Sequence, residues 1–312
     1  MVAVKMRGKL LEKPVAEEIA RQTRLLVEAG SERPLLATVL VGDDPAARSY
    51  RSSIARTFGR VDVLHRPIDL PSDASDDAIF LAVAELNQDP AVTGIMLFLP
   101  LPGRRADTAV RDLVSPFKDV DGITTTSTGL LRLGRPCLEP SCPRAGVTLL
   151  QAYGVELAGA LITLIGRSPV VGGPLATMLT AADATVTVAH RQTRNLAALT
   201  TGADVVAIAA GQANLLRAGM IRPGATILDF GTNVVEGHLR GDANDEELIP
   251  IAARISPVPG GTGPATALVL AYQTMLAAHV QAVGSLDGLH RAPPIGTIAR
   301  TIAEQPEPVS VG

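Results

Sequence analysis

The sequence predicts an α/β protein with two domains, and three features of the chain support this fold class. Its 312 residues are enough for two domains of ordinary size. Apolar runs of strand length alternate with stretches of helix length, as expected where parallel strands are joined by helices. A glycine-rich turn follows one of the apolar runs, which is typical of α/β units that bind a ligand at the ends of their strands.

The first part of the chain shows this alternation as far as residue 115. We expect helices at 14–29, 46–58, 75–87 and 106–113, and strands at 35–41, 61–64 and 93–99. Residues 116–146 are rich in Gly, Pro, Thr and Ser, which predicts a long loop that is functional or links two domains. A helix is expected at 147–153.

The second part repeats the alternation. We expect strands at 161–165, 184–189, 203–209 and 224–230, and helices at 174–182, 245–248 and 265–283. Beyond Gly284 the chain is punctuated by Gly and Pro, which predicts a frayed end.

The glycine turn after residues 161–165 has the pattern of a dinucleotide site. The turn contains Gly166, Ser168 and Gly172, and Pro174 follows at the start of a helix, where its missing N–H is tolerated. A strand, a tight turn and a helix N-terminus together can present backbone N–H groups to a pyrophosphate. The spacing departs from the usual Gly-x-Gly-x-x-Gly, so the local pattern also fits a turn that binds nothing. We interpret the C-terminal half as a Rossmann-like NAD(P)-binding domain.

The charge at the end of the next strand favours NADP. NAD-binding units usually place an Asp or Glu there for the ribose 2′-hydroxyl, whereas this chain has Arg191, with Arg194 nearby and Arg167 in the glycine turn. Arginine suits a 2′-phosphate. Each arginine also fits a solvated surface position, so NAD stays open.

Composition excludes several other classes. The net charge of −3 does not favour nucleic acid or an anionic membrane as a partner, and we expect no membrane span of ~20 apolar residues. The two cysteines, Cys137 and Cys142, have no histidine cluster beside them, so we expect no metal site. The N-terminus lacks the apolar core of a signal peptide, which predicts a cytoplasmic protein.

Several short motifs occur in an order that is specific to one family. They are Gly42-Asp43-Asp44-Pro45 with Ser49-Tyr50, Leu99-Pro100-Leu101-Pro102, Lys118-Asp119-Val120-Asp121-Gly122, Gly166-Arg167-Ser168, Asp229-Phe230-Gly231-Thr232-Asn233, and Pro257-Val258-Pro259-Gly260-Gly261-Thr262-Gly263-Pro264. Together they resemble the methylenetetrahydrofolate dehydrogenase/cyclohydrolase family of the bacterial FolD type. The resemblance covers residues 7–283.

The resemblance implies a domain plan and an assembly. Residues 1–147 plus 264–284 would form a folate-binding catalytic domain and 148–263 the NAD(P)-binding Rossmann domain, with a cleft between them. Residues 285–312 would be a flexible tail. The family also implies tetrahydrofolate as the substrate and a homodimer.

The resemblance also implies roles for particular residues. Tyr50 would stack on the substrate near the pterin, and Asp121 would pair with the amino-pyrimidine edge through two parallel hydrogen bonds. Without the family, Tyr50 would be read as a half-buried helix residue and Asp121 as a turn residue. The glycine-rich loop would contribute Pro259, Gly260 and Gly261 to the substrate site. The implied cofactor-binding residues are Gly166, Arg167, Ser168, Gly172, Arg191 and Thr232.

Two positions depart from the family pattern. Members that catalyse both reactions carry a lysine four residues after the tyrosine and a glutamine before Leu-Pro-Leu-Pro, whereas this chain has Ile54 and Phe98 there. Dehydrogenase-only members change both positions. Hydride transfer mainly needs alignment of the reactants, but hydrolysis needs proton transfer. We therefore predict an NADP-dependent methylenetetrahydrofolate dehydrogenase without cyclohydrolase activity.

Three alternatives stay open. The chain could be a non-catalytic paralogue that binds folate or a nucleotide, an intact bifunctional dehydrogenase/cyclohydrolase in which both substitutions are harmless, or a dehydrogenase of this fold with another substrate.

Overall fold

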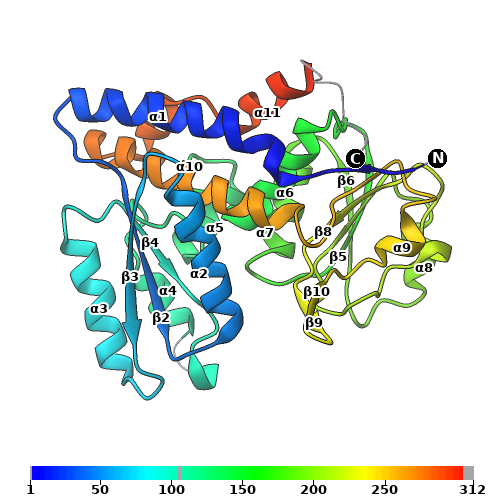
Figure 1. The fold of residues 1–312 in the computed structure, drawn as a ribbon, viewed down its shortest axis with the longest axis horizontal. Helices are drawn as coiled ribbons and strands as arrows, with labels where there is room; N and C mark the ends of the chain where they lie inside the picture. The colour runs from blue at the N-terminus through cyan, green and yellow to red at the C-terminus, as the bar shows by residue number, and fades with distance from the viewer. Residues whose placement is uncertain (1, 105–106, 305–312) are drawn as a thin grey trace. The chain divides into compact units, whose positions relative to one another are not determined.

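The computed structural model describes residues 2–104 and 107–304, which form two α/β units (Figure 1). The six-stranded unit comprises the described residues within Met1–Glu12, Cys142–Thr266 and Ile295–Gly312, and the three-stranded unit comprises those within Lys13–Ser141 and Ala267–Pro294. The chain therefore passes between the two units more than once. This confirms a two-domain α/β fold with parallel sheets.

The six-stranded unit is built on one parallel sheet. Its strands lie in the order β1 (Val4–Lys5), β11 (Arg254–Ile255), β8 (Thr226–Asp229), β7 (Val205–Ile208), β5 (Leu161–Ile165) and β6 (Thr185–Ala189). All residues of β7 and β8 are buried, as expected for parallel strands covered on both faces. Around the sheet are α6 (Ser141–Ala152), α7 (Gly172–Ala181), α8 (Leu196–Thr200), η3 (Ala218–Met220), α9 (Asp245–Leu248) and α11 (Ile295–Glu304). A separate antiparallel hairpin pairs β9 (Asn233–Val235) with β10 (His238–Arg240).

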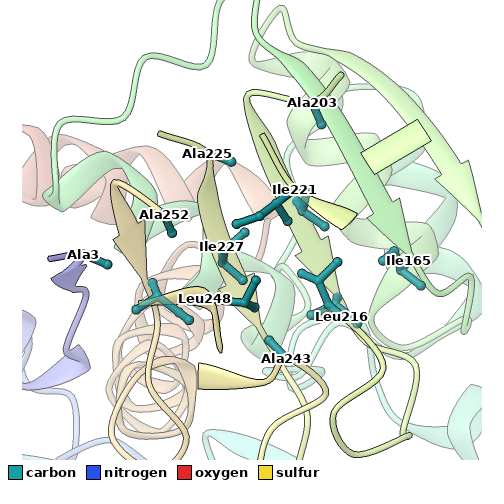
Figure 2. Packing of buried hydrophobic residues seen from close by; sticks show 13 residues of the cluster. Ala3, Ile165, Ala203, Leu216, Ile221, Ala225, Ile227, Ala243, Leu248 and Ala252 are labelled. Carbon is teal, nitrogen blue, oxygen red and sulfur yellow. The ribbon is translucent and has the colours of Figure 1, made fainter. Parts of the chain in front are cut away.

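A hydrophobic cluster of small and branched side chains holds this sheet together (Figure 2). Ile227 on β8 and Ile165 on β5 belong to it, as does Ala3, which directly precedes β1. The backbone of residues 4 and 5 pairs in parallel with β11. The predicted boundary was therefore wrong for the N-terminus: residues up to Glu12 belong to the six-stranded unit, not to the domain that contains residues 13–141.

The three-stranded unit has the parallel strand order β3 (Leu64–Leu70), β2 (Leu35–Val41) and β4 (Gly94–Leu97). Its shorter helices are α2 (Pro45–Phe58), α3 (Asp76–Gln88), η2 (Pro102–Arg104), α4 (Asp107–Leu113), α5 (Thr125–Arg132) and η4 (Leu286–Arg291). Two long helices, α1 (Glu12–Glu28, preceded by η1, Gly8–Leu11) and α10 (Thr262–Val283), provide most of their residues to this unit. They lie side by side in Figure 1, and His279 on α10 hydrogen-bonds Gln22 on α1 at 3.0 Å.

Helix α10 is also the only helix in the described part of the chain that is long and apolar enough to cross a membrane. In this protein 78% of its most apolar stretch is buried. Burial of that kind is the behaviour of a core helix.

The third strand differs from its prediction. A strand was expected at 61–64, whereas β3 spans Leu64–Leu70. Its sequence contains His65, Arg66, Pro67 and Asp69, which obscure the apolar pattern of a strand. β3 forms one edge of its sheet, where a proline and exposed polar residues are tolerated.

The loop predicted at 116–146 is also wrong, because it contains α5 and the start of α6. Thr124 caps α5 by accepting a hydrogen bond from the N–H of Ser127 at 3.0 Å. The buried Asp119 carboxylate accepts further hydrogen bonds from the N–H of Thr124 and the hydroxyl of Ser127. Thr and Ser, which indicated a loop by composition, here build the start of a helix.

The predicted flexible tail at 285–312 is contradicted as far as Glu304. Residues 286–291 form η4 and residues 295–304 form α11. The Tyr272 hydroxyl donates to the carbonyl oxygen of Pro293. A Cβ on Gly288 would lie 2.4 Å from the carbonyl oxygen of His279, so the backbone packs directly on α10. The remainder of the predicted tail lies outside the described residues.

Candidate active and cofactor sites

Helix α2 carries the first two candidate residues on one face. Asp44 caps the helix by accepting a hydrogen bond from the N–H of Ala46 at 2.8 Å, and Pro45 opens its first turn. Tyr50 and Ile54 are four residues apart and therefore project from the same side of the helix. Tyr50 is half-buried, whereas Ile54 is completely buried.

Phe98 lies against Tyr50. It directly follows β4, and its N–H donates to the carbonyl oxygen of Val39 on β2 at 3.0 Å. The rings of Tyr50 and Phe98 meet edge to face, with their centroids 6.2 Å apart and their planes at 86°. Only 8% of Phe98 is exposed. The structure therefore brings Tyr50 and Phe98 together, and Ile54 and Phe98 are both buried apolar side chains.

Asp121 lies in the turn that follows β4 and α4 in the chain. The pKa of its carboxyl is raised to about 7, mainly by burial and also by the neighbouring carboxylate of Asp119, although hydrogen bonds from the hydroxyl and N–H of Ser141 oppose the shift. Gly122 beside it has a φ of 57°, and a Cβ there would lie 2.4 Å from the nitrogen of Pro140. Asp121 is thus held in a tight turn at the start of α6, as a carboxyl that titrates near neutral pH.

The glycine turn of the six-stranded unit depends on close backbone approaches. Gly166 has a φ of 126°, and a Cβ there would lie 2.3 Å from the carbonyl oxygen of Ala209. A Cβ on Gly172 would lie 2.3 Å from the carbonyl oxygen of Gly166. Both positions require glycine, and the turn brings the end of β5 against the end of β7.

Ser168 changes the expected chemistry of this turn. Its hydroxyl accepts hydrogen bonds from the N–H groups of Val171 at 3.1 Å and Gly172 at 3.4 Å. Its carbonyl oxygen accepts another from Gly173 at 2.9 Å. N–H groups at the start of α7 that we expected to face a pyrophosphate are therefore already hydrogen-bonded by Ser168. The serine orders the N-terminus of the helix.

The candidate arginines lie on the surface of the six-stranded unit. Arg167 and Arg191 are both exposed, and neither forms an ion pair within the described residues. The turn after β6 is fixed because the N–H of His190 donates to the hydroxyl of Thr193 at 2.9 Å. Thr232 is exposed and directly precedes β9.

The glycine-rich loop at 257–264 is folded on itself and on the N-terminal segment. The N–H of Gly261 donates to the carbonyl oxygen of Pro257 at 2.7 Å, and the carbonyl oxygen of Gly260 accepts from the N–H of Gly8 at 3.0 Å. A Cβ on Gly8 would lie 2.5 Å from the carbonyl oxygen of Gly261. Pro259 is exposed. The three loop candidates therefore lie together, on a backbone held by internal hydrogen bonds.

Two buried carboxylates at the ends of the strands were missed by the sequence analysis. Asp229 accepts hydrogen bonds from the N–H groups of Gly231 at 2.7 Å, Asp242 at 3.1 Å and Ala243 at 2.8 Å. The pKa of Asp229 is raised to about 6, mainly by burial and also by the nearby carboxylate of Asp242, although these backbone hydrogen bonds oppose the shift. Asp229 belongs to a quoted motif, but nothing in the sequence indicated that Asp242 is buried with it. No group of three or more His, Cys, Asp or Glu side chains in residues 2–104 and 107–304 is arranged to hold a metal ion.

A parallel sheet with a glycine turn after β5, in a chain that has a second α/β unit, is the architecture of two-domain NAD(P)-binding enzymes. The family model described as tetrahydrofolate dehydrogenase/cyclohydrolase, catalytic domain, matches residues 6–121, and the model for the NAD(P)-binding domain of the same family matches residues 140–282. The chain belongs to the tetrahydrofolate dehydrogenase/cyclohydrolase family.

Individual relatives agree with this assignment. The chain is 43% identical over 287 residues to the bifunctional protein FolD 2 of Frankia alni, a match that covers 92% of this chain and 100% of the relative. The crystal structure of the bifunctional enzyme FolD from Campylobacter jejuni has a TM-score of 0.86 at 34% identity and covers 89% of this chain and 99% of its own. The enzyme from Trypanosoma brucei, solved with NADP and an inhibitor, has a TM-score of 0.84 at 31% identity. The match covers 91% of this chain and 99% of the Trypanosoma chain.

Proposed function

We propose that this protein is an NADP-dependent 5,10-methylenetetrahydrofolate dehydrogenase without cyclohydrolase activity. Family membership and the NADP-bound relative from Trypanosoma brucei support the dehydrogenase reaction and the cofactor. The observation that carries the second half of the proposal is the buried apolar pair of Ile54 and Phe98. These residues stand where bifunctional members have a lysine and a glutamine.

The oxidation itself makes few demands on protein acids and bases. NADP, when bound, accepts the hydride from the methylene carbon of the folate. The protein must hold that carbon close to the cofactor, at a separation of ~3–3.5 Å in a reactive arrangement. Tyr50, on a capped helix and against Phe98, would position the substrate. The ionised carboxylate of Asp121 would accept two parallel hydrogen bonds from the amino-pyrimidine edge.

Hydrolysis of the methenyl product makes a different demand. Water must be activated and a proton must be moved, and a positioned acid or base typically contributes ~10²–10⁴-fold to such a step. Ile54 has no ionisable group, and Phe98 has neither a donor nor an acceptor on its side chain. The apolar pair also excludes water from its surroundings. The proton-transfer step therefore lacks the groups that it needs at these positions.

The cofactor would be bound by the six-stranded unit. Arg167 and Arg191 would hold the 2′-phosphate, and the backbone around Ser168 and Gly172 would face the diphosphate. Thr232 would contribute from the segment between β8 and β9. Exposed arginines without ion pairs in the described residues suit this role, because a phosphate would be their first charged partner.

Assembly and location complete the proposal. We expect a cytoplasmic homodimer that binds tetrahydrofolate and neither nucleic acid nor membrane. β6 is the last strand of its sheet, and Thr185, Thr187 and Val188 on it are exposed. An outer edge of this kind can pair with a second copy. Light scattering on the purified chain would measure the assembly.

Two assays test the proposal. Purified protein with methylenetetrahydrofolate and NADP should form NADPH, and the methenyl product should accumulate. When the protein is mixed with methenyltetrahydrofolate alone, the absorbance of the methenyl compound should decay no faster than it does in buffer without protein. Faster decay would identify a bifunctional enzyme. NADP binding in calorimetry without reduction would identify a non-catalytic paralogue, and parallel assays with NAD would settle the cofactor.

A further inference from the structure

The end of β7 has the backbone conformation of an anion-binding site. Gly211 follows the strand with a φ of 65°, in the left-handed region. Successive N–H groups in such a turn converge to form a concavity called a nest, which attracts anions. In this chain a single carboxylate, that of Asp242, accepts hydrogen bonds at 2.6, 2.9 and 2.9 Å from the N–H groups of Ala210, Gly211 and Gln212.

Asp242 also holds the loop after the neighbouring strand. The side-chain amide of Asn233, on β9, donates to the Asp242 carboxylate at 2.8 Å. The N–H of Asp242 in turn donates to Asp229 at the end of β8. A Cβ on Gly231 would lie 2.3 Å from the nitrogen of Asp242. One completely buried carboxylate therefore connects the two segments that follow β7 and β8.

These two segments lie at the place where the fold binds dinucleotides. Open parallel sheets bind ligands beyond the carboxyl ends of their strands, at the point where the chain changes direction across the sheet. Here β5 has β6 on one side and β7 on the other, so that point lies between β5 and β7. The glycine turn after β5 and the segment 209–212 after β7 border it, and Gly166 approaches Ala209 directly.

We infer that Asp242 is an internal anion that fills the nest after β7 and thereby positions the dinucleotide-facing segments 209–212 and 231–233. The inference rests on the proposed function, because it needs a dinucleotide at this edge. With its N–H groups bound to Asp242, the segment after β7 cannot offer them to a phosphate. Asp242 is thus a positioning residue that makes no contact with the cofactor.

Chemical rescue tests this role. Asp242→Ala empties the nest and should weaken NADP binding, measured by calorimetry, by about tenfold or more, since hydrogen bonds to a charged group are strong. Formate is a carboxylate small enough to enter the vacated space and should restore most of the affinity. Asp242→Asn should also bind NADP more weakly, because the side-chain NH2 that replaces one carboxylate oxygen faces N–H donors. Formate should not rescue this variant, because the asparagine side chain still fills the site. Sodium chloride at the same ionic strength is the salt control.

A second carboxylate controls for a general loss of stability. Asp204 accepts a hydrogen bond from the N–H of Leu161 at 2.7 Å and pairs with Arg222, at the amino ends of β7 and β5. Asp204→Ala should lower the melting temperature but leave the affinity for NADP unchanged, with no response to formate. Wild-type protein that binds no NADP would refute the proposed function, whereas wild-type binding with equal binding by Asp242→Asn would refute only the inference.

Poor folding of Asp242→Ala has its own readout. Formate in the refolding buffer should then increase the yield of soluble protein for this variant and not for Asp204→Ala. Formate that raises neither the yield nor the NADP affinity of Asp242→Ala would overturn the inference.

Discussion

The rings of Tyr50 and Phe98 meet edge to face, at a centroid distance of 6.2 Å. Aromatic pairs in this geometry contribute about 0.5–1.5 kcal/mol beyond the area they bury. The contact holds the half-buried ring of Tyr50 against the buried ring of Phe98. If Tyr50 positions the substrate, as we propose, the side chain that orders it is an apolar one.

Replacing Ile54 by lysine alone should strongly destabilise the protein. Ile54 is completely buried, and an ammonium group without a buried partner loses its hydration. We expect Ile54→Lys to lower the free energy of unfolding by about 3 kcal/mol or more, measured by urea denaturation. The matched control Ile54→Met keeps the apolar volume and should lose less than about 1.5 kcal/mol. Equal losses in the two variants would show that the site is solvated.

The double variant Ile54→Lys with Phe98→Gln should gain cyclohydrolase activity. Removal of the phenyl ring gives the amine space, and the amide gives it a hydrogen-bond partner. We expect methenyltetrahydrofolate to decay at least about a hundredfold faster than with wild type, the usual scale of acid–base assistance. Ile54→Met with Phe98→Leu is the apolar control. A folded double variant with no gain would contradict the division of roles.

Substrate use should improve as the pH rises through about 7. The pKa of Asp121 is raised to about 7, so below that pH its carboxyl is protonated and offers fewer acceptors to the pterin edge. The value of kcat/KM for the folate should rise between pH 6 and pH 8 and then level off. Asp121→Asn should remove this inflection and lower kcat/KM across the range. An unchanged inflection would assign the titration to another group.

Protein stability should respond to pH in the opposite direction. In the folded protein the pKa values of Asp121 and Asp229 are raised to about 7 and about 6, from an ordinary value of 3.8. The folded state therefore binds protons more tightly than the unfolded chain, and these two groups stabilise it most at low pH. Their contribution should fall as the pH rises from about 4 to about 7. Urea denaturation of wild type and of Asp121→Asn across this range would measure how the free energy of unfolding depends on pH. The same pH dependence in both proteins would contradict the prediction.

Removing the guanidinium at position 191 should reduce the preference for NADP. Arg191 is exposed beyond β6, and we propose that it binds the 2′-phosphate. Arg191→Ala should raise the KM for NADP by about tenfold, the scale of a lost hydrogen bond to a charged group, and leave that for NAD nearly unchanged. Arg300→Ala, an exposed arginine on α11, is the charge control. An equal rise of the KM for NADP and of the KM for NAD would exclude a contact between Arg191 and the 2′-phosphate.

A methyl group at position 241 should disturb the buried carboxylates. A Cβ on Gly241 would lie 2.0 Å from Oδ2 of Asp229, which is itself fully buried. We expect Gly241→Ala to lower the free energy of unfolding by about 1–3 kcal/mol. Gly219→Ala, where nothing lies within 4 Å of the new Cβ, should change it by less than about 0.5 kcal/mol. Thermal or urea unfolding would compare the two.

Some elements could be predicted because the information is local. The strand at 161–165 and the helix at 245–248 agree with the structure in their bounds, since a continuous apolar run and an Asn-capped acidic turn need few distant contacts. β3 and α5 could not be predicted in this way. The first is an edge strand that tolerates Pro67, and the second begins in a network centred on the buried Asp119.

The sequence by itself determined the α/β alternation, the glycine turn, the family and the two apolar replacements, because these depend on residue order and spacing. The tertiary structure decided that residues 4 and 5 pair with β11 in the six-stranded sheet. It decided that the hydroxyl of Ser168 accepts hydrogen bonds from N–H groups of its own turn. It also decided that Asp242 fills the nest after β7. The physical reason is that burial and hydrogen bonding join residues far apart in the chain: Asp242 is about thirty residues from the N–H groups it accepts, and no local pattern records that distance.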